Sequence, residues 1–219
     1  MATTAKGIVF LLALVANVAG VWLHITPVGA ATGAPEGKST EFIRRSCSST
    51  LYPALCYASL ASYASAVAQD PTQLALVAAN VSLARVRSVS FHVSNLRRIA
   101  VVRKLEPRSV STLQDCLDNL DDAGDLTQQA AAELRLLLTA EGPYIAWRVS
   151  NAQTWLSAAL TNEDTCADGF AAMAPGAGAA SPGGGAPRMK ADVCGRVRQA
   201  KEYTSNALAL VNVLVGMRR

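Results

Sequence analysis

The clearest chemical signal in the sequence is a pair of cysteines placed almost equally far from a helix-breaking Gly142-Pro143 dipeptide. Cys116 precedes this dipeptide and Cys166 follows it, and both flanks have the apolar spacing of amphipathic helices. If the flanks fold back at the turn, a rise of ~1.5 Å per residue brings the two cysteines to within ~3 Å of the same height. A disulfide accepts roughly 4.4–6.8 Å between Cα atoms. The spacing therefore predicts a helical hairpin closed by a Cys116–Cys166 bond.

Three further cysteines complete a set of five. Four cysteines can pair in three ways, and we assign the second bond to Cys47 and Cys56, which flank a bend at Pro53. Cys194 is then a free thiol. It either joins a second copy of the chain or is buried as a small apolar residue.

The sequence offers little for enzymatic or metal chemistry. Beyond the N-terminal segment the chain has one histidine, His92, which cannot supply a catalytic triad or a zinc site alone. No phosphate-binding glycine motif occurs. An acidic cluster lacks the glycine and ligand spacing of a calcium loop, and its members are Asp118, Asp121, Asp122 and Asp125. We therefore expect no catalytic, cofactor-binding or metal-binding residue, and no cofactor.

Charge is divided unevenly between two expected helices. Residues 71–104 carry six basic side chains and no acid, whereas residues 109–140 carry six acids and one arginine. Neighbouring antiparallel helices with this pattern either neutralise each other along their edges or present charged faces to a partner. For the second interpretation the residues we select on the acidic helix are Asp118, Asp122 and Asp125. Nucleic acid is not an expected partner, because aromatic residues do not alternate with the basic ones.

The first 31 residues have the pattern of a secretory signal peptide. Lys6 precedes an uncharged apolar run, and Val28-Gly29-Ala30 matches a small-x-small cleavage site. An uncleaved anchor helix is the alternative, but the apolar run is short for a membrane span. No later run looks long and apolar enough to span a membrane, so no membrane contact is expected after cleavage. Asn80-Val81-Ser82 is an N-glycosylation sequon that secretion would make usable.

The expected fold is all-α, because long amphipathic segments alternate with short helix-breaking ones. We expect a disordered spacer at 32–40 and one domain at 41–219, made of an α-hairpin at 41–69 and an up-down-up-down four-helix bundle at 70–219. A flexible Ala/Gly/Pro loop is expected at 174–187. The expected helices are 41–47 and 53–69 in the hairpin, and 71–104, 109–140, 143–172 and 189–216 in the bundle.

Several motifs resemble the plant invertase and pectin methylesterase inhibitor family. The resemblance spans about 41–215, and its most specific part is Thr165-Cys166-Ala167-Asp168-Gly169-Phe170. The other matching segments are Phe42-Ile43, Cys47 to Cys56 with Thr50 and Tyr52-Pro53, Ser59-Leu60, Leu113 to Cys116, Ser157 to Thr161, and Ser205 to Leu210.

This resemblance implies a four-helix bundle with an N-terminal α-hairpin and with the disulfides assigned above. It also implies a non-enzymatic role in the apoplast or cell wall, where the chain would bind pectin methylesterase in a 1:1 complex and block its active-site cleft. An acid invertase is the alternative target. A third possibility is a non-inhibitory cell-wall glycoprotein, suggested by the loop at 174–187.

Overall fold

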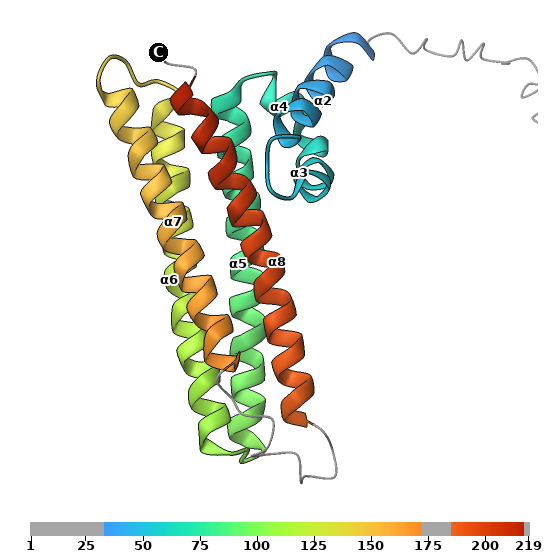
Figure 1. Ribbon diagram of the computed structural model, residues 1–219, viewed down its shortest axis with the longest axis vertical. Coiled ribbons are helices and arrows are strands. Elements are labelled where there is room, and N and C mark those ends of the chain that lie inside the picture. Colours follow the sequence, from blue (N-terminus) through green and yellow to red (C-terminus); the bar gives the residue numbers. More distant parts are fainter. Residues whose placement is uncertain (1–32, 172–184, 217–219) are drawn as a thin grey trace, which may run out of the picture. The chain divides into compact units, whose positions relative to one another are not determined.

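The structure, a computed structural model, describes residues 33–171 and 185–216. These residues form helices and turns, and no strand occurs among them. Four long helices form the body of the fold (Figure 1), and shorter helices precede them along the chain. The long helices are α5 (Pro71–Val102), α6 (Pro107–Leu137), α7 (Tyr144–Ala171) and α8 (Gly185–Gly216). The shorter ones are α2 (Gly33–Cys47), α3 (Pro53–Leu60), the 3₁₀ turn η1 (Ala61–Tyr63) and α4 (Ala64–Val67).

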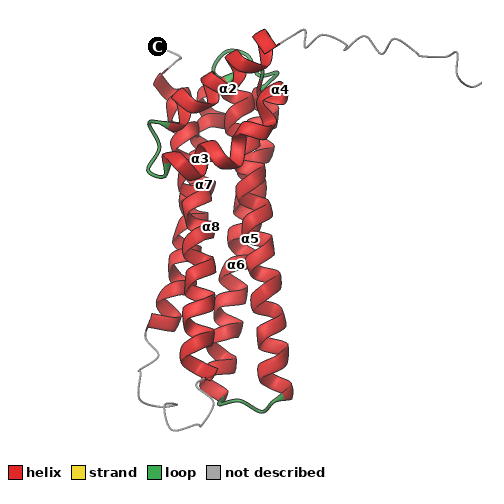
Figure 2. Ribbon diagram, turned by 90° about the vertical axis from the view of Figure 1, so that its right-hand side faces the viewer, coloured by secondary structure: helices red, strands yellow, loops and turns green. Residues whose placement is uncertain are grey.

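The long helices form an antiparallel bundle in which consecutive helices are neighbours and α8 packs back against α5 (Figures 1 and 2). Short connections at 103–106 and 138–143 force α6 to run back along α5 and α7 to run back along α6. The predicted all-α bundle is therefore confirmed.

Local sequence signals set the helix ends. The Asp70 carboxylate accepts hydrogen bonds from the backbone N–H groups of Thr72, at 2.6 Å, and Gln73, at 3.1 Å, and Pro71 occupies the first helical position. In the turn between α6 and α7, Gly142 has a φ of +58°, a conformation that glycine adopts without steric cost.

The buried side chains form two apolar clusters along the bundle. The first cluster joins the hairpin to one half of the bundle, for example through Ile43, Leu74 and Leu134. The second fills the other half and includes the Cys116–Cys166 disulfide and Phe170. Many members of both clusters are alanine and valine, which allows the helices to approach closely.

Fully buried polar residues lie where the two apolar clusters meet. Thr204 of α8 donates a hydrogen bond to Glu163 of α7 and shares one with Ser82 of α5, both at 2.8 Å. The second carboxylate oxygen of Glu163 has no hydrogen-bond partner among the described residues. Burial raises the pKa of Glu163 from 4.5 to about 8, against the opposing effect of the Thr204 bond. Glu163 is therefore protonated in the folded protein over most of the acidic to neutral range.

The disulfides join the cysteines paired from the sequence. Cys116 and Cys166 connect α6 to α7 with 4.2 Å between Cα atoms, and Cys47 and Cys56 connect α2 to α3 with 5.5 Å. Cys194 is free and half-buried on α8. It packs at the edge of the second apolar cluster.

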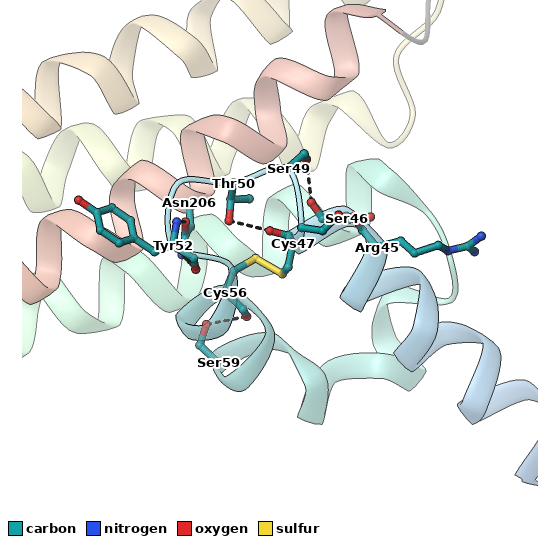
Figure 3. The surroundings of a disulfide bond; sticks show 10 residues. Arg45, Ser46, Cys47, Ser49, Thr50, Tyr52, Cys56, Ser59 and Asn206 are labelled. Carbon is teal, nitrogen blue, oxygen red and sulfur yellow. Dashed lines mark hydrogen bonds between the residues drawn. A yellow bond between two sulfur atoms is a disulfide. The ribbon is translucent and has the colours of Figure 1, made fainter.

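Asn206 attaches the hairpin to the bundle (Figure 3). Its side-chain oxygen accepts from the backbone N–H of Tyr52 at 3.2 Å, and its amide nitrogen donates to the Tyr52 carbonyl at 3.1 Å. Both residues belong to segments that carry the family resemblance. Their role in the structure is to hold the disulfide-closed bend of Cys47–Cys56 against α8.

Two expectations about the N-terminal region were wrong. Residues 33–40 are not a disordered spacer, because α2 begins at Gly33. Ser39, Ile43 and Cys47, four residues apart, bury one face of this helix, a pattern masked by the small polar residues around it. The single helix expected at 53–69 is divided by η1, although Leu60, Ala64 and Val67 still bury a common face. No glycine or proline marks this break in the sequence.

The start of α8 and the composition of α5 differ from what the sequence predicted. Helix α8 begins at Gly185, four residues before its predicted start, because a proline such as Pro187 is tolerated in a first helical turn. The leader at 1–31 and most of the loop at 174–187 lie outside the described residues. Contrary to expectation, α5 is long and apolar enough by composition to cross a membrane. Half of its apolar window is buried inside the bundle, as in the core helix of a helical domain.

Candidate partner-binding surface

An acidic row follows the outer face of α6. Asp118, Asp122 and Asp125 are all exposed, and their spacing of four and three residues places them on one side of the helix. Asp118 accepts a hydrogen bond from Gln114 on the same helix at 2.6 Å. Asp122 and Asp125 have no hydrogen bond or ion pair with any residue that the structure describes. The row is therefore directed to solvent.

Asp121, the fourth acid of the sequence cluster, has a different role. It accepts a hydrogen bond of 2.5 Å from the Ser90 hydroxyl on α5 and so helps to join two helices. No group of three or more potential ligands within the described parts of the chain has the geometry of a metal site. The four acids thus divide into one inter-helix contact and a row of three.

Large apolar side chains lie at the end of α6 and the start of α7. Leu136, Tyr144 and Trp147 are 51%, 66% and 57% exposed. A hollow of about 420 Å³ beside them is lined by Leu136, Thr139, Ala140, Glu141, Tyr144 and Arg148. Exposed aromatic residues beside a hollow are typical anchors of protein–protein interfaces.

A polar contact fixes α6 against α7 beneath these aromatic residues. Glu133 accepts hydrogen bonds from Arg148 at 2.9 Å and from Asn151 at 3.2 Å, and the Arg148–Glu133 ion pair is largely shielded from solvent. The Arg148 guanidinium also lies 5.9 Å from the centroid of the Trp147 ring. Together with the Cys116–Cys166 bond farther along the helices, this contact makes α6 and α7 a rigid pair. We call their exposed face, with the acidic row and the three apolar residues, the α6–α7 surface.

The acidic row was predicted from the sequence, whereas Leu136, Tyr144 and Trp147 were not. A signal for the two aromatic residues was present. The apolar stripe of α7 runs through Ile145, Val149 and Ala152, and Tyr144 and Trp147 fall outside it. Large aromatic residues outside the core stripe of a helix are candidates for binding.

Helices α5 and α6, to which the two interpretations of the charge pattern apply, meet without a direct ion pair between the residues that the structure describes. No basic residue of α5 forms an ion pair with an acid of α6 in the described parts of the chain. The contacts between these helices are Ser90 with Asp121 and Arg87 with Gln128. Arg87 and Asp121 therefore lie along the edge that the two helices share, each bonded to an uncharged side chain, while the acidic row on α6 and Arg98 on α5 have no partner of opposite charge among the described residues.

His92 and Asn80 both lie on α5, outside the α6–α7 surface. His92 bonds through Nε2 to Asp192 of α8, which also pairs with Arg196. Burial opposes the ionisation of Asp192, but the bonds from His92 and Arg196 outweigh it, so the pKa of Asp192 lies below its ordinary value. His92 thus helps to join α5 to α8 through Asp192. Asn80 is exposed, and its glycosylation remains a prediction.

Comparisons with known proteins identify the family. A family model described as plant invertase/pectin methylesterase inhibitor matches residues 41–210. A 21 kDa protein of Daucus carota is 37% identical over 185 residues, covering 84% of this chain and 88% of the relative. Pectinesterase inhibitor 11 of Arabidopsis thaliana is also 37% identical, over 176 residues that cover 80% of this chain and 81% of the relative.

A solved structure supports the same assignment at the level of the fold. The crystal structure of a mutant form of a pectin methylesterase inhibitor from Arabidopsis matches with a TM-score of 0.55 and 20% identity, covering 76% of this chain and 92% of that chain. The family model and the relatives identify the family as well as the fold. The chain belongs to the plant invertase and pectin methylesterase inhibitor family, a family of inhibitors and not of enzymes.

Proposed function

We propose that this protein is a secreted inhibitor that binds a pectin methylesterase in a 1:1 complex and covers its active-site cleft. Its action would limit the removal of methyl esters from pectin in the plant cell wall. Relatives named pectinesterase inhibitors support the choice of target. The observation that carries the proposed mode of binding is the α6–α7 surface, in which exposed aromatic anchors adjoin an exposed acidic row.

The physical properties of this surface suit an inhibitor. A helix pair held by a disulfide and by the Glu133–Arg148 ion pair loses little conformational entropy on docking, which favours affinity. From Asp118 to Leu136 the surface is ~27 Å long at ~1.5 Å per residue. That length suits a standard interface of ~800 Å² per partner.

The two parts of the surface would have different roles. Tyr144 and Trp147 can each bury a large apolar area at the centre of an interface, where most binding energy is concentrated. Asp118, Asp122 and Asp125 would attract a basic rim on the esterase and mainly speed association.

An acid invertase is the second candidate target, because the description of the matching family names invertase as well. The third possibility, a non-inhibitory glycoprotein, depends on the loop at 174–187, most of which lies outside the described residues. Carbohydrate analysis of the secreted protein tests that possibility directly.

The deciding experiment is a titration of the purified protein against a plant pectin methylesterase and an acid invertase in parallel at mildly acidic pH. We expect esterase activity to fall to a plateau at near-equimolar inhibitor while invertase activity is unchanged. Selective loss of invertase activity would replace the first target with the second. If neither activity falls, the inhibitor proposal is wrong.

A further inference from the structure

The bundle separates its charges into two layers. Helices α5 and α8 together carry nine basic and two acidic side chains, whereas α6 and α7 carry three basic and nine acidic ones. The α6–α7 surface uses the acidic layer. The proposed inhibition does not use the basic layer.

Basic and apolar side chains alternate in a line along the exposed face of α5. Arg87, Phe91, Arg98 and Val102 are exposed and lie on one side of the helix, since their separations of four and seven residues correspond to one and two turns. Phe91 and Val102 are 71% and 76% exposed, so the line presents apolar as well as basic groups to solvent. The line is ~22 Å long at ~1.5 Å per residue. We call it the α5 stripe, and it ends at the turn that carries Arg103.

A hollow lies at the end of the α5 stripe. It has a volume of about 290 Å³ and is lined by Arg98, Ile99, Val102 and Arg103. Two guanidinium groups thus border an apolar floor. Arg98 donates to the Asn95 side chain at 3.2 Å, and neither Arg98 nor Arg103 pairs with a carboxylate in the described part of the protein. Both charges are therefore available to an external anion.

We propose that the α5 stripe binds a linear polyuronate, a polysaccharide whose sugar units carry free carboxylates. Guanidinium groups bind carboxylates through paired, charge-assisted hydrogen bonds. An apolar floor between them accepts the non-polar face of a sugar ring, as ligand sites usually combine apolar walls with few polar groups. Because the basic and apolar groups repeat along the helix axis, an extended polymer suits them better than a small ligand.

The choice of a uronate polymer rests on the function proposed above, because demethylation of pectin leaves carboxylates on the polymer. The α5 stripe would hold the inhibitor on demethylated segments while the α6–α7 surface binds the esterase. The two surfaces lie on neighbouring helices of the bundle, and they adjoin where Arg87 of the α5 stripe bonds to Gln128 of α6.

The test measures binding of the full mature chain to soluble polygalacturonate, without any esterase, by affinity electrophoresis at low and at moderate salt. Highly methyl-esterified pectin of similar length is the uncharged comparison, and duplex DNA and vesicles of anionic phospholipid are the other polyanions. The stripe variant is R87E/R98E/R103E. The matched control, K38E/R45E/R135E, makes the same change in net charge at exposed positions away from the stripe. Circular dichroism establishes that both variants keep their helical content.

We expect the wild-type chain to bind polygalacturonate, to ignore the esterified polymer, and to lose affinity as salt increases. The stripe variant should bind roughly tenfold more weakly, whereas the control should change by less than about threefold. Equal loss in both variants, or equal binding to esterified pectin, would overturn the proposal. Tighter binding to DNA or to vesicles than to polygalacturonate would also overturn it. Since no esterase is present, these results are independent of whether inhibition itself is confirmed.

Discussion

The two layers of the bundle differ in how they are held together and in what they expose. Helices α6 and α7 are joined covalently by Cys116–Cys166 and present acids and aromatic residues. Helices α5 and α8 are joined by hydrogen bonds, such as His92 with Asp192, and present mainly basic residues. A core of small apolar residues leaves the outer positions free, so one fold can carry two surfaces of opposite charge. The more rigid layer is the one to which we assign inhibition.

The largest expected effect comes from removing the covalent link of the α6–α7 layer. The Cys116–Cys166 bond closes a 50-residue loop, so the double change C116A/C166A should lower the free energy of unfolding by about 4 kcal/mol. The Cys47–Cys56 bond closes a nine-residue separation, and C47A/C56A should cost roughly 2.6 kcal/mol. Urea unfolding of both variants gives the comparison. A larger loss of unfolding free energy in C47A/C56A than in C116A/C166A would contradict the view that the α6–α7 layer depends on the Cys116–Cys166 bond.

Glu163 joins the two layers through Thr204, and its burial gives stability a pH dependence. Below pH 4.5 the residue is protonated in both folded and unfolded chains. As pH rises above 4.5 the unfolded chain loses this proton, while the folded chain retains it up to about pH 8, so unfolding becomes easier. Between pH 5 and 7 the wild type should lose about 2–3 kcal/mol of unfolding free energy relative to the Glu163→Gln variant. Parallel slopes for the two proteins in urea unfolding across this range would show that Glu163 ionises normally.

The exposed aromatic residues distinguish the layers by function. Trp147→Ala should weaken esterase inhibition roughly 30-fold, as expected for an anchor at the centre of an interface. Phe91→Ala on α5 removes an aromatic ring that is more exposed than Trp147 and should leave inhibition unchanged. Inhibition constants for the two variants test this difference. Loss with Phe91→Ala and none with Trp147→Ala would move the inhibitory surface to the basic layer.

A smaller effect is expected where the hairpin meets the basic layer. Asn206→Ala removes both hydrogen bonds to Tyr52 and leaves partly buried backbone groups unpaired. The cost should be about 1–2 kcal/mol, with faster hydrogen exchange confined to the bend around Tyr52. Unchanged exchange at this bend would mean that the Cys47–Cys56 bond positions it without help from α8.

Periodicity and helix-breaking residues were sufficient to predict the bundle, since Asp70-Pro71 and Gly142-Pro143 mark helix ends by local chemistry. The nearly equal spacing of Cys116 and Cys166 about the turn likewise predicts that the two cysteines lie close enough to bond. The extension of α2 to Gly33 could not be predicted, because its buried face packs on distant residues. The break at η1 also has no local signal.

The candidate surface was predictable only in part. Exposed acids are recognisable from charge and helical spacing, and so the acidic row was found. Burial of Glu163 was not predicted, because its sequence neighbours are polar and only the fold brings it against Thr204 and Ser82. Leu136 could not be selected from the sequence, because nothing in an apolar segment distinguishes a leucine that will be exposed from one that will be buried.

The most direct test of the central claim is charge reversal of the acidic row. The variant D118K/D122K/D125K should associate with pectin methylesterase at least about tenfold more slowly than wild type at low salt, with the difference shrinking as salt rises. The matched control E41K/E106K/E202K makes the same change in net charge on other parts of the protein and should retain most of the wild-type rate. If instead both variants associate equally fast, or the control is the slower one, the α6–α7 surface is not the inhibitory face.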